Sequence, residues 1–208
     1  MKVFITFSPR QGEGKLYISQ YIPQDNERLL YKQGTRFPII PVINGYTEPG
    51  ETIRVIAFCQ DFPDCHRNLN YLQQELEDLF ERKELLSGNS DGALFQKIIV
   101  ADSASVHTQI DIFQKLIDVI DDGDDIHACL TYGNKPVPMA ELMALRYVRL
   151  LKKDTYVSCI AYGDYGWGGA PCRIYDETAL VHLDDVIRVL SQSGSPNPGE
   201  MLKQIIGM

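Results

Sequence analysis

Basic residues are scarce in this chain of 208 residues. Twenty lysines and arginines stand against 28 aspartates and glutamates, which gives a formal net charge of −8. Binding to long DNA or RNA needs a basic surface, so the composition argues against that class of function. It leaves room for a small anionic ligand held by a few local cations. No apolar run approaches the length of about 18 residues that marks a membrane span, so we expect no membrane partner.

Two common phosphate-binding motifs are also missing. The loop after the first expected strand lacks the GxGxxG fingerprint, and GxxxxGK[ST] occurs nowhere, which disfavours binding of NAD or ATP through those loops. The five cysteines are an odd and scattered set, which is typical of reduced thiols in a cytoplasmic protein. Cys59, Cys65 and His66 lie close together, but no second pair completes a zinc site. We therefore expect neither a metal nor a cofactor.

The apolar residues alternate between strand-like and helix-like spacing along residues 1–190. The expected strands are 3–7, 37–43, 52–58, 95–101, 126–131, 156–162 and 173–175, and the expected helices are 68–86, 110–120, 138–151 and 180–190. Such alternation predicts the α/β class, with a Rossmann-like, mostly parallel sheet and helices on both of its faces. Ligand sites of such sheets lie in the loops beyond the carboxyl ends of the strands.

The tail of the chain has a different composition. Residues 191–199 are rich in serine, proline and glycine, and a short apolar stretch, 201–206, follows them. We expect one domain over 1–190, followed by a linker and the start of a truncated effector domain over 191–208. A frayed terminus is the alternative.

The loop 131–138 lies between an expected strand and an expected helix. Backbone N–H groups and the helix dipole favour an anion at such a position. Gly133 permits close approach of the backbone, Lys135 brings a positive charge, and Tyr132 and Asn134 could stack on a base and read its edge. The candidate binding residues of this loop are Thr131, Tyr132, Gly133, Asn134, Lys135 and Pro136. The alternative is that glycine and proline serve here only to turn the chain.

The loop after the first strand is a second candidate, with a serine and a nearby arginine that suit a phosphorylated ligand. Its candidate binding residues are Ser8, Pro9, Arg10 and Gln11. Trp167, the only tryptophan, lies in the glycine-rich segment 163–169 and could close over a ligand base or pack against the edge of the sheet. A solvated loop remains the alternative for the segment around Ser8.

The segment 126–138, IHACLTYGNKPVP, resembles the DxTHGFRxxP signature of CRISPR-associated Rossmann-fold (CARF) domains, the cyclic oligoadenylate sensors of type III CRISPR systems. The strand end at 162–163 and the segment 174–180, IYDETAL, also resemble that family, and the similarity is clearest over 95–190. Cys129, Tyr132 and Lys135 replace the Asp, His and Arg of the signature. Lysine keeps the charge of arginine but loses its bidentate geometry.

The resemblance implies a homodimer, or a higher oligomer with an effector, that binds one cyclic tetra- or hexa-adenylate across its two-fold axis and switches the effector. It leaves a ring nuclease open as the alternative function. In that metal-independent reaction a ribose 2′-hydroxyl attacks the neighbouring phosphate, Lys135 stabilises the developing charge, and Ser8 holds the phosphate or the hydroxyl. Outside the family, the remaining alternative is a small nucleotide-binding Rossmann-like protein.

Overall fold

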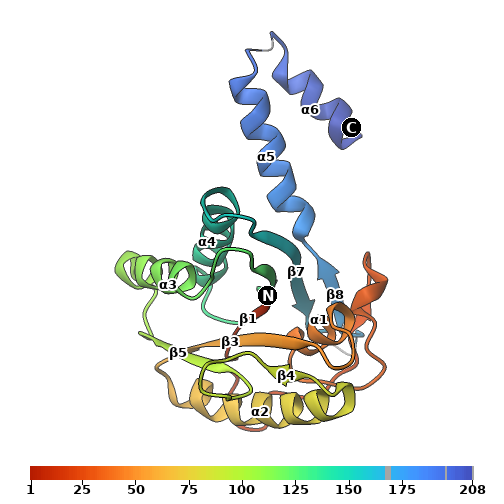
Figure 1. Cartoon of the computed structure of the whole chain (residues 1–208), viewed down its shortest axis with the longest axis vertical. Helices are drawn as coiled ribbons and strands as arrows, with labels where there is room; N and C mark the ends of the chain where they lie inside the picture. Colours follow the sequence, from red (N-terminus) through yellow and green to blue (C-terminus); the bar gives the residue numbers. More distant parts are fainter. Residues whose placement is uncertain (167–169, 195, 208) are drawn as a thin grey trace.

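The computed structural model describes residues 1–166, 170–194 and 196–207. They form an eight-stranded sheet with helices on both sides (Figure 1). The strands are β1 (Lys2–Phe7), β2 (Ile22–Pro23), β3 (Thr52–Gln60), β4 (Leu86–Ser87), β5 (Gln96–Val100), β6 (Asp125–Cys129), β7 (Tyr156–Asp164) and β8 (Arg173–Asp176). Their order is β2-β8-β7-β6-β1-β3-β4, and β5 also pairs with β3.

The centre of the sheet is parallel. Strand β1 pairs in parallel with β3 on one side and with β6 on the other, and β6 pairs in parallel with β7. Only β8 runs antiparallel to its neighbour β7. Residues 3–7 of β1 are all buried, as expected for a strand covered on both faces. The predicted α/β class with a Rossmann-like, mostly parallel sheet is therefore confirmed.

Helices lie on both sides of the sheet, and the last two extend away from it. They are η1 (Glu27–Leu29), α1 (Ile39–Tyr46), α2 (Pro63–Lys83), α3 (Val106–Asp118), α4 (Val137–Leu151), α5 (Thr178–Gln192) and α6 (Pro198–Ile206). Figure 1 shows α2 along one side of the sheet and α3 and α4 along the other. Helix α1 contacts α2, and α3 packs against α4.

One expected strand is a helix. The segment 37–43 was expected to be extended, but α1 begins at Ile39 and buries nearly all of its first five residues. A short run of apolar residues that is buried on all sides has no periodicity that separates helix from strand. Pro38 and Pro41 occupy the N-cap and the first turn of α1, where backbone N–H groups have no partner within the helix and proline therefore costs little.

Helix α2 begins and ends earlier than the expected 68–86. Pro63 stands in its first turn, and its end is set by Glu84, which adopts the left-handed conformation with φ of 54°. The glycines at 88 and 92 therefore follow the helix and do not terminate it.

The two last helices leave the sheet. Helix α5 includes residues 191 and 192 of the expected linker, and α6 contacts α5 without burying any of its residues. Figure 1 shows the pair extending away from the sheet beyond β8.

Candidate functional site

The loops that follow the parallel strands meet at one edge of the sheet. Strands β1, β3, β5 and β6 run in the same direction, so the segments after Phe7, Gln60, Val100 and Cys129 emerge together. Both loops that the sequence singled out, 8–11 and 131–136, lie at this carboxyl edge. We take it as the candidate site.

Ser8 is buried at the root of the first loop. Its hydroxyl donates a hydrogen bond of 2.6 Å to the carbonyl of Cys65, and its N–H donates one of 2.7 Å to the carbonyl of Phe58. Only 1% of the residue is exposed. Ser8 therefore joins the end of β1 to the start of α2. Its hydroxyl proton already forms the hydrogen bond to Cys65 and is not available to a ligand.

Asn68 of α2 fixes the next residues of this loop. Its side-chain nitrogen donates hydrogen bonds of 2.9 Å to the carbonyls of Pro9 and Gln11. The guanidinium of Arg67 donates a further bond of 3.1 Å to the Gln11 carbonyl. The first loop is thus held against α2 because its backbone carbonyls accept hydrogen bonds from side chains of the helix.

Arg10 connects the first loop to the loop after β5. Its guanidinium forms an ion pair with Asp102, donates to Gln60 Oε1 at 3.3 Å, and lies 4.5 Å from the centre of the Phe62 ring. The hydrogen bond to Asp102 raises the pKa of Arg10 above its ordinary value. Its charge is therefore largely balanced within the protein.

The second loop turns sharply at Gly133. This residue has φ of +108°, and a Cβ added to it would lie 2.9 Å from a methyl group of Val137, so only glycine fits without strain. Before it, the Thr131 hydroxyl accepts a hydrogen bond of 2.8 Å from the N–H of Gly163, which ties the loop to β7. After it, Pro136 caps α4 with no side-chain hydrogen bond.

Lys135 is exposed, and no ion pair or hydrogen bond engages its ammonium group within the described residues. The backbone N–H groups of Gly133, Asn134 and Lys135 likewise donate no hydrogen bond to any described residue. By contrast, the first N–H of α4, on Val137, already bonds the Asn134 carbonyl at 2.9 Å, and Pro138 has none. The capacity to bind an anion therefore resides in residues 133–135, just before the helix.

Tyr132 occupies a different place from the one the sequence suggested. It was expected to stack on a ligand base, but only 4% of it is exposed, and its ring packs edge-on against Phe37. Its hydroxyl donates to the Arg36 carbonyl at 2.5 Å and lies 2.9 Å from the hydroxyl of Tyr165. In this structure the buried side chain of Tyr132 anchors the loop through its contacts with Arg36 and Phe37. Burial raises the pKa of Tyr132 well above its ordinary value.

The loop between β5 and α3 was missed by the sequence analysis. Its Asp102 pairs with Arg10, and its Ser103 carbonyl accepts hydrogen bonds from Asn134 Nδ2 at 3.2 Å and from Gln109 Nε2 at 3.4 Å. This loop joins the two predicted loops to each other. The sequence could have indicated this loop, because it follows the expected strand 95–101 and so emerges at the same edge of the sheet. Trp167 lies outside the described residues.

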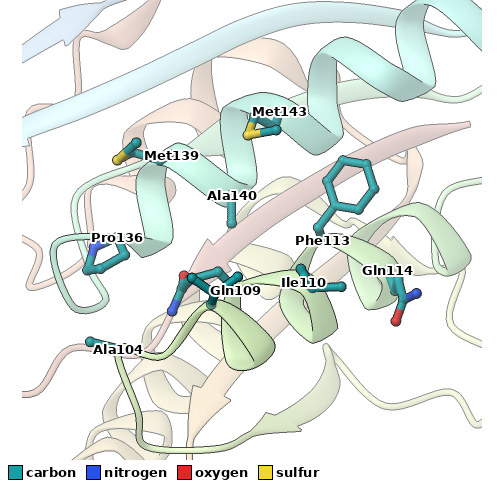
Figure 2. Close-up of a pocket in the computed structure, with 10 residues that line it drawn as sticks. Ala104, Gln109, Ile110, Phe113, Gln114, Pro136, Met139, Ala140 and Met143 are labelled. Atoms are coloured by element: carbon teal, nitrogen blue, oxygen red, sulfur yellow. The ribbon is translucent and has the colours of Figure 1, made fainter.

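A cavity of about 560 Å³ lies between α3 and α4, directly beside these loops (Figure 2). It starts at Ala104 and Pro136, which border the loops described above. Its lining residues are Ala104, Val106, Gln109, Ile110, Phe113, Gln114, Pro136, Met139, Ala140 and Met143. Apart from two glutamines, the lining is apolar.

Comparison with known proteins gives no family for this chain. No family model matches it, and its sequence matches no curated protein. Within the described residues, no three histidine, cysteine, aspartate or glutamate side chains are grouped as a metal site. No helix in the described part of the chain has both the length and the apolar character that crossing a bilayer requires.

Proposed function

We propose that this chain is a sensor that binds a cyclic oligoadenylate, most simply cyclic tetra- or hexa-adenylate, at the carboxyl edge of its sheet. The observation that carries the proposal is the set of free donors in residues 133–135. Three consecutive backbone N–H groups and the Lys135 ammonium have no partner among the described residues. Successive N–H groups around a residue with positive φ form a concave site for an anion such as a phosphate.

The charge at this edge suits a small anion better than a long nucleic acid. Arg10 is paired with Asp102, and Arg67 is paired with Asp64, so neither cation is free to extend a basic surface. Lys135 remains as a local cation beside the free N–H groups. A ring with few phosphates needs no more than such local contacts. The resemblance of 126–138 to the CARF signature is the reason for choosing adenylate rings as the proposed ligand class.

The same resemblance supports a homodimer. A ring with two-fold symmetry meets each loop of an isologous dimer twice, so one binding loop per chain is enough to hold both halves of the ring. Ligand-dependent switching of an effector, either a further domain after α5 or a separate protein, completes the proposed function.

Ring cleavage receives less support from the geometry. The proposed role of Ser8 needs its hydroxyl at the ligand, whereas that hydroxyl is buried and donates to Cys65. The groups that remain for charge stabilisation are the Lys135 ammonium and the free N–H groups of 133–135. An unrelated nucleotide-binding protein would use the same free donors but would bind mononucleotides as well as it binds rings.

The test is calorimetric titration with cyclic tri-, tetra- and hexa-adenylate and with AMP, followed by mass analysis of the recovered ligand. We expect one ring per two chains, recovered intact, and weak or no binding of AMP. Lys135→Ala should weaken binding by about 1.5–3 kcal/mol, the range for a hydrogen bond to a charged group. The matched control is Lys153→Ala, an exposed lysine beyond the opposite end of α4.

The outcomes separate the alternatives. Linear products with a 2′,3′-cyclic phosphate would show a ring nuclease. Preference for AMP would favour the unrelated nucleotide-binding protein. Failure to bind any ring, or a Lys135→Ala variant with unchanged affinity, would contradict the proposed site.

A further inference from the structure

Helices α5 and α6, which we call the arm, are only lightly packed against the rest of the protein. Of the described residues 178–192 that make up α5, only Val181 and Leu190 are buried, and α6 buries none of its described residues. Helix α5 contacts β7 and α6, and Figure 1 shows the arm extending away from the sheet. A segment with few buried apolar contacts is among the less stable parts of a fold.

The arm is fixed to the sheet where α5 begins. The N–H of Glu177 donates a hydrogen bond of 2.7 Å to the carbonyl of Ile160 in β7, and the N–H of Ile160 donates one of 2.8 Å to the hydroxyl of Thr178. The N–H of Thr178 donates in turn to a carboxylate oxygen of Asp176 at 3.0 Å. These bonds hold the first turn of α5 and leave the rest of the helix to other contacts.

The seam between α5 and α4 contains two hollows. A cavity of about 210 Å³ is lined by Leu142 of α4 and Leu180 of α5, among others. A second, of about 520 Å³, lies between Arg149 of α4 and His182 of α5, above the first residues of β7. Closely packed elements leave few voids larger than a water molecule. The two helices therefore lie beside each other without close packing along these stretches.

Two ion pairs cross this seam. Nε of Arg146 lies 2.6 Å from Oδ2 of Asp184, and the guanidinium of Arg149 pairs with Asp185. The side chain of Arg146 is 46% exposed and that of Asp184 is 36% exposed. Ion pairs with this much exposure contribute little stability and are weakened by salt. The attachment of α5 to α4 is therefore weak and depends on charge.

Both pairs can separate without leaving a charge buried and unpaired. Arg146 and Asp184 are already partly solvated, and the departure of α5 opens Arg149 to water. Asp185 also lies 3.9 Å from Arg188 on α5 itself, so it keeps a cationic neighbour when α5 leaves α4. An uncompensated buried charge is what makes the loss of an ion pair costly, and none arises here.

We propose that the pairs Arg146–Asp184 and Arg149–Asp185 form a latch. When both pairs are formed, the arm lies against α4; when both are broken, the arm swings about a pivot at residues 177–178. The latch converts a change in ionic conditions at the seam into a change in the position of α6. It rests on the seam between α4 and α5 and needs no ligand.

The latch is also connected to the candidate site through α4. This helix begins at Val137, directly after the loop 131–136, and carries both arginines in its last two turns. A ligand that shifts the beginning of α4 shifts the arginines with it, because a helix moves as a rigid element. This connection to a ligand rests on the proposed function.

The first test measures the position of the arm by double electron–electron resonance. Spin labels are placed on Gln74→Cys in α2 and Ile205→Cys in α6, both exposed, in a Cys172→Ser background because the other four cysteines are buried. Dilution with unlabelled chain restricts the signal to distances within one chain. We expect one distance at about 0.05 M sodium chloride and a second population at about 1 M, where the screening length is only about 3 Å.

Removal of the latch charges should have the same effect without salt. In the double variant Asp184→Asn, Asp185→Asn, the ratio of released to latched arm at low salt should rise about fivefold, as expected for the loss of two partly exposed pairs. The matched control is Asp111→Asn, which removes the partly exposed pair with Lys115 within α3 and should leave the distance unchanged. A single distance that responds neither to salt nor to the double variant would overturn the proposal.

The second test exchanges the charges of one pair. Arg146→Asp should release the arm, and Arg146→Asp combined with Asp184→Arg should restore the original distance. Structural damage by either substitution would not be repaired by the other, so failure of this rescue would refute the latch. Addition of cyclic tetra-adenylate then examines the connection to the site. Ring binding with an unchanged distance would contradict that connection, and absence of ring binding would contradict the proposed function; both results leave the salt-dependent latch standing.

Discussion

The side-chain nitrogen of Asn134 donates a hydrogen bond of 3.2 Å to the carbonyl of Ser103, and this single bond joins the loop before α4 to the loop before α3. The carbonyl can only accept, so it fixes which end of the Asn134 amide faces it. The other end, Oδ1, is buried and has no hydrogen-bond partner within residues 1–166, 170–194 and 196–207. Through this bond the Asn134 side chain helps to hold the free N–H groups of 133–135 in place.

Removing this contact tests its contribution. Asn134→Ala should lower the free energy of unfolding by about 1 kcal/mol, the usual net value of one hydrogen bond. Asn134→Asp should cost more, because a carboxylate cannot donate to the Ser103 carbonyl and would face it with a negative charge. Urea unfolding of the three proteins measures the order. Equal stability of all three would show that the bond does not hold the loop.

Gly133 provides a test of backbone strain with a matched control. Gly133→Ala places a Cβ 2.9 Å from Val137 at φ of +108°, whereas Gly92→Ala has φ of +70° and nothing within 4 Å. Both variants incur the cost of a left-handed residue, roughly 1–2 kcal/mol, but only Gly133→Ala adds a collision. We expect a larger loss of unfolding free energy at 133 than at 92. Similar losses would mean that α4 shifts to admit the methyl group.

Glu141 gives the protein a defined dependence on pH. It is fully buried in α4, and neither carboxyl oxygen has a hydrogen-bond partner among the residues that the structure describes. Burial raises the pKa of Glu141 well above its ordinary value. The folded state therefore keeps a proton that the unfolded state loses above a pH of about 4.3. The stability associated with this group is complete below that pH and declines as the pH rises toward the folded pKa.

Replacement of Glu141 should remove this decline. Thermal unfolding between pH 4 and pH 8 compares the natural chain with Glu141→Gln, which keeps the shape of the protonated acid. We expect the two proteins to be closest in stability at the acidic end and the variant to gain relative to the natural chain as the pH rises. Parallel curves over the whole interval would contradict a buried, protonated Glu141.

Cys59 lies beside a histidine and an aspartate, as the nucleophile of a catalytic cysteine site does. Unlike such a nucleophile, it is not exposed to solvent. Its sulfur lies 3.6 Å from Nδ1 of His66, and Nε2 of His66 lies 2.9 Å from a carboxylate oxygen of Asp61. Cys59 is fully buried, however, and that burial raises the pKa of its thiol. A buried thiol that holds its proton is inert. Iodoacetamide should therefore label Cys172 first in the folded protein, as mass spectrometry of digested samples would show. Early labelling of Cys59 would refute this.

The parts of the fold that follow from periodicity were predictable. Strands β3, β5, β6 and β7 and helices α3 and α4 each have a clear apolar pattern, and their order already indicates a parallel sheet. The segment of α1 could not be assigned because residues 39–43 are almost uniformly buried and lack a polar face. Its helical state depends on what packs around it.

The sequence could predict which loops form the candidate site, but it could not predict how their side chains are placed. Topology alone brings the loops after β1 and β6 to one edge, so their proximity follows from the alternation of elements. Whether Lys135 is free and Ser8 occupied depends on partners far along the chain, such as Cys65. The burial of Tyr132 depends on Arg36 and Phe37 in the same way. Single-sequence patterns contain no information on such distant contacts.

The borders of the sheet have a consequence for aggregation. The strand order ends in β2 and β4, which are two residues long, and β2 contains Pro23, which has no N–H to offer another strand. The longer β5 beside β4 carries an exposed lysine, Lys97. Short strands, proline and lysine at the border of a sheet all hinder the addition of strands from other molecules. These borders therefore disfavour fibril growth by the addition of strands.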